Sequence, residues 1–207
     1  SPMGVNDVKL MSIWSCIKTS AKDVLHDSRG LAATEFAMIV PMMLVMFLGT
    51  VEVSSGVAVN RKVTIIARTL SDLTSQSTAV GDSDMTNFFA ASNGIMWPYS
   101  SAPTLATITE LYIDPKTSVA RVQWSKGAAP RSLGSTVTIP SGLIGKDSSG
   151  NTIANQYLIF SEVSYLYKPV VGYVMAKAGV KLSDTSFTRP RQSICVFYGS
   201  EGTCPTN

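Results

Sequence analysis

The sequence is nearly devoid of histidine and of the short motifs that mark common catalytic sites. Its one histidine is His26, within the first thirty residues, so the rest of the chain lacks the base of a His-containing triad and any histidine metal ligand. No G-x-S-x-G, H-E-x-x-H or Walker motif occurs. The sequence therefore predicts no enzyme, no catalytic residue, no metal centre and no cofactor.

Charged residues are also scarce. They make up 15% of the 207 residues, which is low for a cytoplasmic domain. The formal net charge of +3 is small, and the basic residues do not form a stripe. These features argue against a nucleic-acid partner and agree with an exported, membrane-anchored protein.

A single long apolar run stands out near the N-terminus. Residues 36–51 carry no charge, and the wider window 31–59 contains only Glu35 and Glu52 as charged residues. A helix needs ~20 mostly apolar residues to cross a bilayer, and no other part of the sequence offers them. The run predicts a single-pass membrane helix with the lipid bilayer as its surroundings.

The two carboxylates stand near opposite ends of this predicted span. At ~1.5 Å per residue, the step from Glu35 to Glu52 is about 25 Å, so neither lies at the bilayer centre, where ionisable groups cost most. For Glu52 alone, a side chain that reaches back to the membrane edge is sufficient explanation. Glu35 differs because of the residues that precede it.

Gly30 followed by Glu35 resembles the leader-peptide junction of type IV pilins. The longer string RGLAATEFAMIVPMMLVMFLGTVEV is similar to the TadE-like family, the minor pseudopilins of tight-adherence (type IVc) pilus systems. The residues that fit that pattern are Gly30, Glu35, Phe36, Ala37, Pro41 and Glu52. Leu31 departs from the small residue often found at the first mature position. The close resemblance covers about 40 residues.

The resemblance implies a processing step and a set of partners. A prepilin peptidase would cut between Gly30 and Leu31, and Glu35 would then neutralise the new amino group of a neighbouring subunit. Other pilins, minor pilins and inner-membrane assembly platform proteins would be partners. The N-terminus would lie in the cytoplasm and the C-terminal domain in the periplasm, or in the extracellular pilus after assembly.

A second function class remains open at this point. The apolar helix could be a permanent anchor for a periplasmic binding or scaffold protein that has no role in a filament. Lysines and arginines are nearly balanced on the two sides of the span, so the orientation follows from the resemblance and not from charge.

The predicted organisation has four parts. Residues 1–30 are a cytoplasmic leader, 31–59 the membrane half of a long helix, 60–76 its amphipathic continuation, and 77–207 an exported α+β domain. The continuation is inferred from an apolar seam at helical spacing, formed by Val59, Val63, Ile66, Leu70 and Leu73. We expect this seam to pack on the chain's own domain in a pilin-like arrangement, a long helix against a small antiparallel sheet.

Within the exported domain the sequence predicts mainly strands and turns. A short helix that runs through residues 87–90 is expected to be N-capped by Asp82 or Ser83. Residues 106–113 and 119–124 form a predicted hairpin around the turn 114–117. Irregular loops with a strand near 136–139 follow, then a strong strand over 155–167, a helix or turn over 170–178, and a last strand over 193–198.

Cysteine usage differs between the two predicted sides of the membrane. Cys16 falls in the leader, in the reducing cytoplasm. Cys195 and Cys204 lie in the exported tail with eight residues between them, where disulfides persist. We expect these two to be bonded, which would stabilise the tail by roughly 2–3 kcal/mol on the chain-entropy model.

Three aspartates could be ion ligands and two arginines could bind a partner, but each group also has a purely structural interpretation. Asp82, Asp84 and Asp147 offer oxygen ligands, but such residues are far more often helix caps and turns, and EF-hand spacing is absent. Arg189 and Arg191 follow a segment similar to the C-terminal part of many TadE-like chains. They are candidates for a partner-binding patch, and solvated arginines are at least as good an interpretation.

Overall fold

The computed structural model describes residues 28–169, 179–200 and 202–206. Most of the predicted leader and the predicted helix or turn at 170–178 therefore lie outside the described residues. The first described element, α2, is a helix of 48 residues, Ser28–Ser75, that contains Pro41. The chain divides into two compact units, one ending at Val51 and the other comprising Glu52–Asn207.

The part of α2 in the second unit forms one wall of the domain core. Val59, Val63, Ile66 and Leu70 are completely buried, as the seam predicts, whereas Leu73 is half-buried. Arg61 and Arg68, on the other side of the helix, are exposed. The periodic apolar positions thus face the sheet, and hydrophobic burial holds this half of α2 in place.

The main sheet has five strands in the order β4-β3-β2-β5-β6. Their bounds are Thr104–Ile113 for β2, Ala120–Gly127 for β3, Thr136–Val137 for β4, Gln156–Tyr167 for β5 and Val180–Thr188 for β6. All four strand pairs are antiparallel. A 3-10 turn, η1 (Ser141–Leu143), lies in the loop between β4 and β5. The α+β, pilin-like fold class is confirmed.

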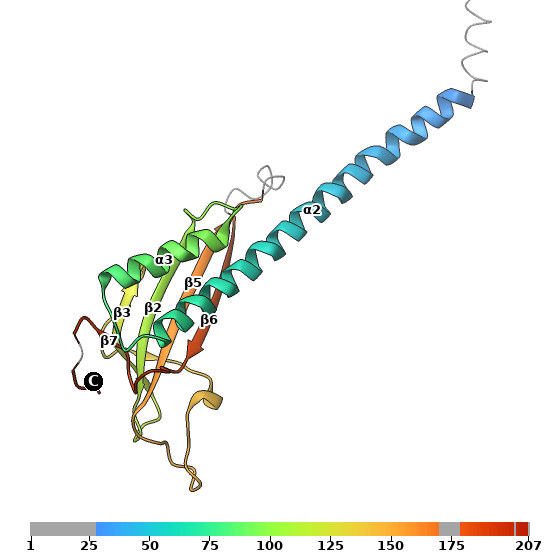
Figure 1. Ribbon diagram of the computed structural model, residues 1–207. Helices are drawn as coiled ribbons and strands as arrows, with labels where there is room; N and C mark the ends of the chain where they lie inside the picture. Colours follow the sequence, from blue (N-terminus) through green and yellow to red (C-terminus); the bar gives the residue numbers. More distant parts are fainter. Residues whose placement is uncertain (1–27, 170–178, 201, 207) are drawn as a thin grey trace, which may run out of the picture. The chain divides into compact units, whose positions relative to one another are not determined.

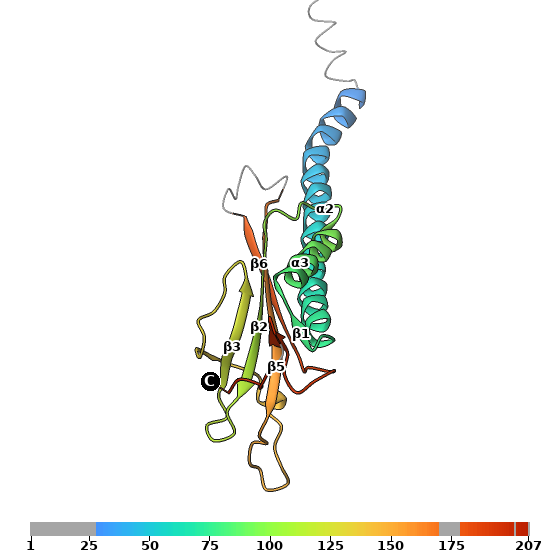
Figure 2. The same ribbon diagram turned by 60° about the vertical axis from the view of Figure 1, so that its left-hand side comes forward.

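Both helices of the second unit cover the same face of this sheet (Figures 1 and 2). The first, α2, crosses β5 and β6, and the second, α3 (Asp82–Met96), lies over β2 and β3 (Figure 1). On β5, Ile159, Val163 and Tyr165 belong to the core under the helices. Leu158 and Phe160 belong to a second core on the opposite face, which Ile139, Leu143 and Ile144 cover. The alternation follows from the two-residue period of a strand.

The predicted hairpin is confirmed. β2 and β3 pair with each other through Ile113 and Ala120, and Asp114 forms the turn between them. Its carboxylate accepts hydrogen bonds from the Lys116 amide at 2.8 Å and the Thr117 hydroxyl at 2.9 Å. The strong strand signal before Pro169 is also confirmed, as β5, and the strand near 136–139 is present as the short β4.

Three local predictions are wrong. The helix α3 extends to Met96, well beyond Ala90, because Met85, Ser92 and Met96 along it are buried. Its N-cap is Gly81, whose amide donates to the Asp84 carboxylate at 2.8 Å, so Asp82 is already the first helical residue. The C-terminal strand is only β7, Phe197–Tyr198, which pairs in parallel with β1, Ala79–Val80.

The strand β6 has no counterpart in the sequence-based prediction. Two of its polar residues face α2: the Asp184 carboxylate accepts a hydrogen bond from Thr64, and the Ser186 hydroxyl accepts one from Ser71 at 3.0 Å. At these two positions hydroxyl groups on α2 take the place of the apolar contacts by which strands are normally recognised in a sequence.

Replacing a core residue of α2 provides a test of this packing. We expect Ile66→Ala to lower the free energy of unfolding by about 2–5 kcal/mol, because Ile66 is completely buried between helix and sheet. The matched control is Ile65→Ala, one residue away and 50% exposed, which should change it by less than about 0.5 kcal/mol. Denaturant unfolding of the full-length protein in detergent measures both. Equal effects of the two substitutions would contradict this packing.

Candidate functional site

The predicted processing segment lies at the start of α2. Gly30 is in the first turn, and apart from its chain neighbours and the nearby backbone of its own helix no atom lies within 4 Å of the position that a Cβ would take there. Glu35 is exposed. From residue 36 to residue 51 every side chain is exposed except that of Val40, which is half-buried. The candidate cleavage site and the candidate assembly carboxylate therefore precede an apolar surface that the described residues leave uncovered.

This helix is the membrane candidate of the structure. Among residues 28–169, 179–200 and 202–206, α2 is the one helix that is long and apolar enough to cross a bilayer, by length and composition. Pro41 interrupts the backbone hydrogen bonding inside it, which membrane helices tolerate better than soluble ones. A single membrane anchor is consistent with these properties.

Glu52 has a specific partner in the domain. Its carboxylate accepts a hydrogen bond of 2.7 Å from the hydroxyl of Tyr167, the last residue of β5. The ring of Tyr167 also lies against Gly56, one turn further along α2, at 3.7 Å from where a Cβ would be. Burial and the neighbouring Glu52 carboxylate raise the pKa of Tyr167 to about 12, so the phenol remains a donor at neutral pH. Glu52 thus joins α2 to the sheet at the point where the second unit begins.

The C-terminal tail carries the predicted disulfide. Cys195 and Cys204 are bonded, and Cys195 is completely buried. The next residue, Val196, is held by two side chains of the sheet. Its amide donates to the Glu110 carboxylate at 2.6 Å, and its carbonyl accepts a hydrogen bond from the Trp124 indole at 2.7 Å. The bridge and these two hydrogen bonds fix the tail on the same sheet face as the helices.

Glu110 is the most unusual group in this arrangement. It is completely buried, and its second carboxylate oxygen has no hydrogen-bond partner among the described residues. Burial raises its pKa to about 7, against the lowering effect of the Val196 amide. Sequence reasoning missed this residue. The available signal was a glutamate within an apolar strand, between Ile108 and Leu111.

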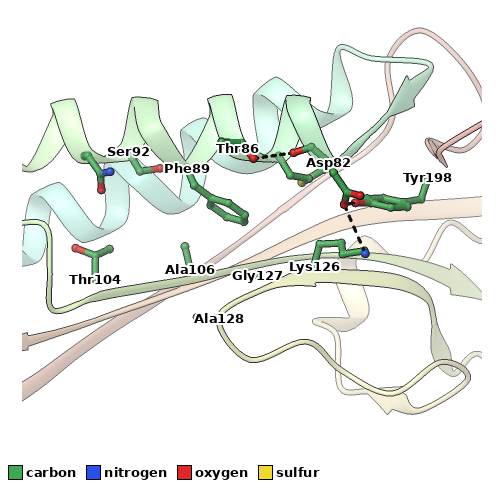
Figure 3. A pocket seen from close by; sticks show the side chains of 12 residues that line it. Asp82, Thr86, Phe89, Ser92, Thr104, Ala106, Lys126, Gly127, Ala128 and Tyr198 are labelled. Atoms are coloured by element: carbon green, nitrogen blue, oxygen red, sulfur yellow. Dashed lines mark hydrogen bonds and ion pairs between the residues drawn. The ribbon is translucent and has the colours of Figure 1, made fainter.

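A cleft of about 440 Å³ separates α3 from β2 and β3 (Figure 3). At one end the Asp82 carboxylate accepts a hydrogen bond from Tyr198 and lies 3.7 Å from the Lys126 ammonium, which stands over the Tyr198 ring. Tyr198 and Lys126 lower the pKa of Asp82. Phe89 and Ala106 line the apolar part. The charges in this cleft neutralise one another, so the cleft does not select for a charged ligand.

The carboxylates considered as ion ligands act as caps and turns. Asp82 pairs with Lys126, and Asp84 accepts the Gly81 amide. Asp147 accepts the amides of Ser149 at 2.8 Å and Asn151 at 2.9 Å, and these bonds lower its pKa. No group of three or more His, Cys, Asp or Glu side chains suited to a metal occurs among the described residues.

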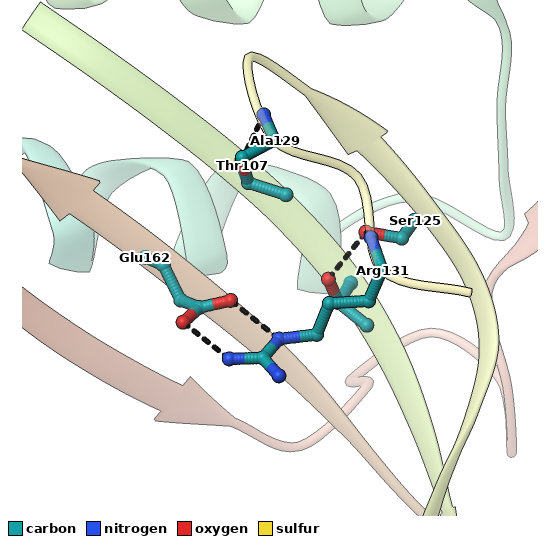
Figure 4. A network of polar contacts seen from close by, with 6 residues as sticks. Thr107, Ser125, Ala129, Arg131 and Glu162 are labelled. Atoms are coloured by element: carbon teal, nitrogen blue, oxygen red, sulfur yellow. Dashed lines mark hydrogen bonds and ion pairs between the residues drawn. The ribbon is translucent and has the colours of Figure 1, made fainter. Parts of the chain in front are cut away.

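The opposite face of the sheet carries a polar network (Figure 4). Arg131, in the loop after β3, donates two hydrogen bonds of 2.7 and 2.6 Å to the Glu162 carboxylate of β5. The same loop is held by Ser125, which accepts the Arg131 amide at 3.0 Å, and by Thr107, which accepts the Ala129 amide at 3.1 Å. These bonds anchor a loop across the sheet, which is a structural role.

The two arginines considered as a partner-binding patch contact their own domain. Arg189 donates to the Leu143 carbonyl at 2.9 Å. The guanidinium of Arg191 lies 2.6 Å from the Asp72 carboxylate, and its amide donates to the Ser75 carbonyl at 2.8 Å. Both side chains are exposed and link α2, the β4–β5 loop and the tail, and the partner-binding patch stays a prediction.

Comparison with known proteins places the N-terminal segment in a family. Residues 30–69 match the family model described as TadE-like protein, so the resemblance carried by Gly30, Glu35 and Pro41 is confirmed over these residues. No curated protein and no solved structure matches the chain. The TadE-like family is a structural, pilin-like family, which implies no enzymatic role, and the match is consistent with a protein associated with the tight-adherence pilus system.

The raised pKa of Glu110 predicts a pH dependence of stability. A carboxyl whose pKa is about 7 in the folded protein and 4.5 in the unfolded chain stabilises the folded state fully below pH 4.5. This stabilisation is lost as the pH rises through 7. The loss is on the order of 3 kcal/mol, from 1.36 kcal/mol for each unit of difference. Denaturant unfolding between pH 4.5 and 8 checks it.

Glu110→Gln is the comparison that isolates this group. The amide has the same shape and does not ionise, so the difference in unfolding free energy between the two proteins should vary with pH in this range. A difference that stays constant from pH 4.5 to 8 would show that Glu110 does not titrate in the folded protein with the raised pKa.

Proposed function

We propose that this protein is a minor pilin-like subunit, a pseudopilin, of a type IVc (tight-adherence) pilus. In this role a prepilin peptidase removes the leader between Gly30 and Leu31, and α2 holds the subunit in the inner membrane with the domain in the periplasm. The subunit then takes part in assembly or initiation of the filament together with other pilins and platform proteins.

The observation that carries this proposal is the sequence at the start of α2. The segment matched to the TadE-like family begins at Gly30, includes Glu35 and runs through the exposed apolar residues 36–51. A membrane anchor alone needs the apolar residues but not the glycine or the glutamate. An ionisable group inside such a segment is costly and is usually retained for function.

Glu35 has a physical role in this proposal. After cleavage the amino group of Leu31 lies at the membrane edge, little more than one helical turn from Glu35. In a bundle of subunits, the carboxylate of one chain can neutralise the amino group of its neighbour, because opposite charges in a poor dielectric favour each other's ionised forms. Pairing of this kind would set the register of one subunit against the next.

The alternative is a permanently anchored periplasmic scaffold or binding protein. The domain favours this alternative in one respect: it has a cleft between α3 and the sheet. The cleft lacks a net charge, however, and the alternative gives no account of Gly30 and Glu35.

The mature N-terminus distinguishes the two functions. We expect mass spectrometry of the membrane-fraction protein, from cells with the matching peptidase, to find Leu31 as the first residue. A Gly30→Trp variant, in which a bulky side chain occupies the cleavage position, should keep its leader. A wild-type protein that retains its leader in such cells would favour the permanent anchor.

Removing the assembly carboxylate separates processing from incorporation. Glu35→Ala should still be cut, because it leaves Gly30 and Leu31 unchanged, but it should no longer enter filaments or bind other pilins in pull-down experiments. Glu35→Asp keeps the charge and should retain part of this function. If Glu35→Ala assembles as well as the wild-type protein, Glu35 does not neutralise a neighbouring amino group.

A further inference from the structure

Exposed apolar side chains gather at one end of the domain. Outside α2, four of the large apolar side chains that are exposed in the described part of the chain are Trp97 (78% exposed), Leu105 (55%), Val180 (51%) and Leu166 (37%). We name these four residues the apolar rim. An isolated exposed apolar residue needs no explanation, but a group at one place on a domain indicates a contact surface.

The strand register places three rim residues at the same end of the sheet, Leu105 and Leu166 on the face away from the helices and Val180 on the helix face. Leu105 is the second residue of β2 and stands opposite Ser164 of β5. Leu166, two residues beyond Ser164, lies diagonally from Leu105 on the same face of the sheet. Val180 is the first residue of β6 and pairs with Tyr167.

The fourth rim residue, Trp97, follows α3 and is attached to α2. The Lys62 ammonium donates hydrogen bonds to the carbonyls of Ile95 at 2.7 Å and Trp97 at 2.9 Å. The Tyr165 hydroxyl donates to the Ser100 carbonyl at 3.0 Å, which ties the segment after Trp97 to the end of β5. The backbone around Trp97 is thus held, while its indole remains in contact with solvent.

The same end of the domain is where α2 enters it. Tyr167, the partner of Val180, donates to Glu52, the first residue of the second unit. The residue before it, Val51, closes the uncharged run 36–51. The rim therefore lies at the end of the domain where α2 enters it, at Glu52.

The exposed charged side chains beside the rim are those of two lysines, whereas the neighbouring carboxylates are half-buried. Lys168 and Lys181 are exposed, directly after β5 and near the start of β6. The neighbouring carboxylates of Glu52, Glu162 and Asp184 accept hydrogen bonds from Tyr167, Arg131 and Thr64, respectively. Lysines beside exposed Trp and Leu match the headgroup layer of a bilayer, where aromatic rings are enriched and anionic phosphates attract cations.

We propose that the apolar rim rests in the headgroup layer of the bilayer that α2 crosses, with Lys168 and Lys181 on the phosphates of anionic phospholipids. This inference rests on the membrane anchoring within the proposed function. The domain is then held at the membrane surface by two contacts, the helix and the rim, and removal of the subunit from the membrane must break both.

Tryptophan fluorescence of the full-length protein tests the position of the rim. Trp14→Phe removes the tryptophan of the leader, and Trp124 is buried in the structure. In vesicles of phosphatidylglycerol and phosphatidylethanolamine brominated near the headgroup end of the acyl chain, we expect loss of Trp97 emission. The Trp97→Phe variant shows which part of the emission comes from Trp97. The double substitution Lys168→Ser and Lys181→Ser should reduce the quenching by brominated lipid, because it removes the cations that contact the phosphates.

A matched control uses an apolar side chain at the opposite end of β5. Ile153 precedes that strand and is 49% exposed, so Ile153→Trp in the Trp97→Phe background places a similar probe away from the rim. This probe should be quenched by acrylamide in water and not by brominated lipid.

The possible outcomes distinguish a failure of the rim proposal from a failure of the membrane-anchor proposal. Alkaline flotation of the vesicles measures anchoring independently. If the protein floats while Trp97 is quenched by acrylamide and not by brominated lipid, the rim proposal is wrong and the anchor stands. The rim proposal is also wrong if neither quencher reaches Trp97, since another protein surface, such as a second copy, then covers it. If the protein does not float, the anchor itself fails and the rim proposal fails with it.

Discussion

An apolar helix surface must be covered by something other than water, and α2 meets this requirement in two different ways along its length. From Val59 onward its apolar seam is buried against the sheet of its own domain. From residue 36 to residue 51 the apolar side chains point outward around the helix, and the described residues do not cover them. The hydrophobic effect therefore demands a second partner for the N-terminal half, and a bilayer supplies one over a length of ~20 residues.

The domain is organised around the half of α2 that it does bury. Hydroxyl and carboxylate groups fix the helix against β5 and β6, through Ser161 to the Ala67 carbonyl, Thr64 to Asp184 and Tyr167 to Glu52. On the same face, Glu110 and Trp124 hold Val196, and the disulfide secures the tail behind it. Directional hydrogen bonds thus determine where the helix and the tail lie on a core that hydrophobic burial stabilises.

Local sequence patterns predicted the elements whose side chains alternate or repeat. The seam from Val59 to Leu70, the hairpin turn at Asp114 and the strand β5 were predicted because period and turn chemistry are local properties. The strand β6 was not, because two of its helix-facing residues are Asp184 and Ser186, which are half-buried and contact hydroxyl groups of α2 instead of apolar side chains. The cap at Gly81 was missed because the carboxylate that completes it belongs to Asp84, three residues later.

The residues of the candidate site also divide into those that local sequence patterns predict and those that depend on long-range contacts. The disulfide pair was predicted from cysteine position and is confirmed, whereas the roles of Gly30 and Glu35 were predicted from a short motif and stay predictions. Glu110 and the partner of Glu52 were not predicted, since both depend on residues 86 and 115 positions away along the chain. Long-range contacts of this kind follow from the strand order and register, which a single sequence does not specify.

Water accessibility along α2 tests the central claim most directly. Spin labels at single cysteines replacing Leu44, Phe47 and Arg61, in a Cys16→Ser protein with its disulfide intact, can be measured by electron paramagnetic resonance in vesicles. We expect oxygen dissolved in lipid, and not a water-soluble nickel chelate, to relax the labels at positions 44 and 47, with the reverse at position 61. Access of the nickel chelate to positions 44 and 47 would contradict the division of α2 into a lipid-covered half and a domain-covered half.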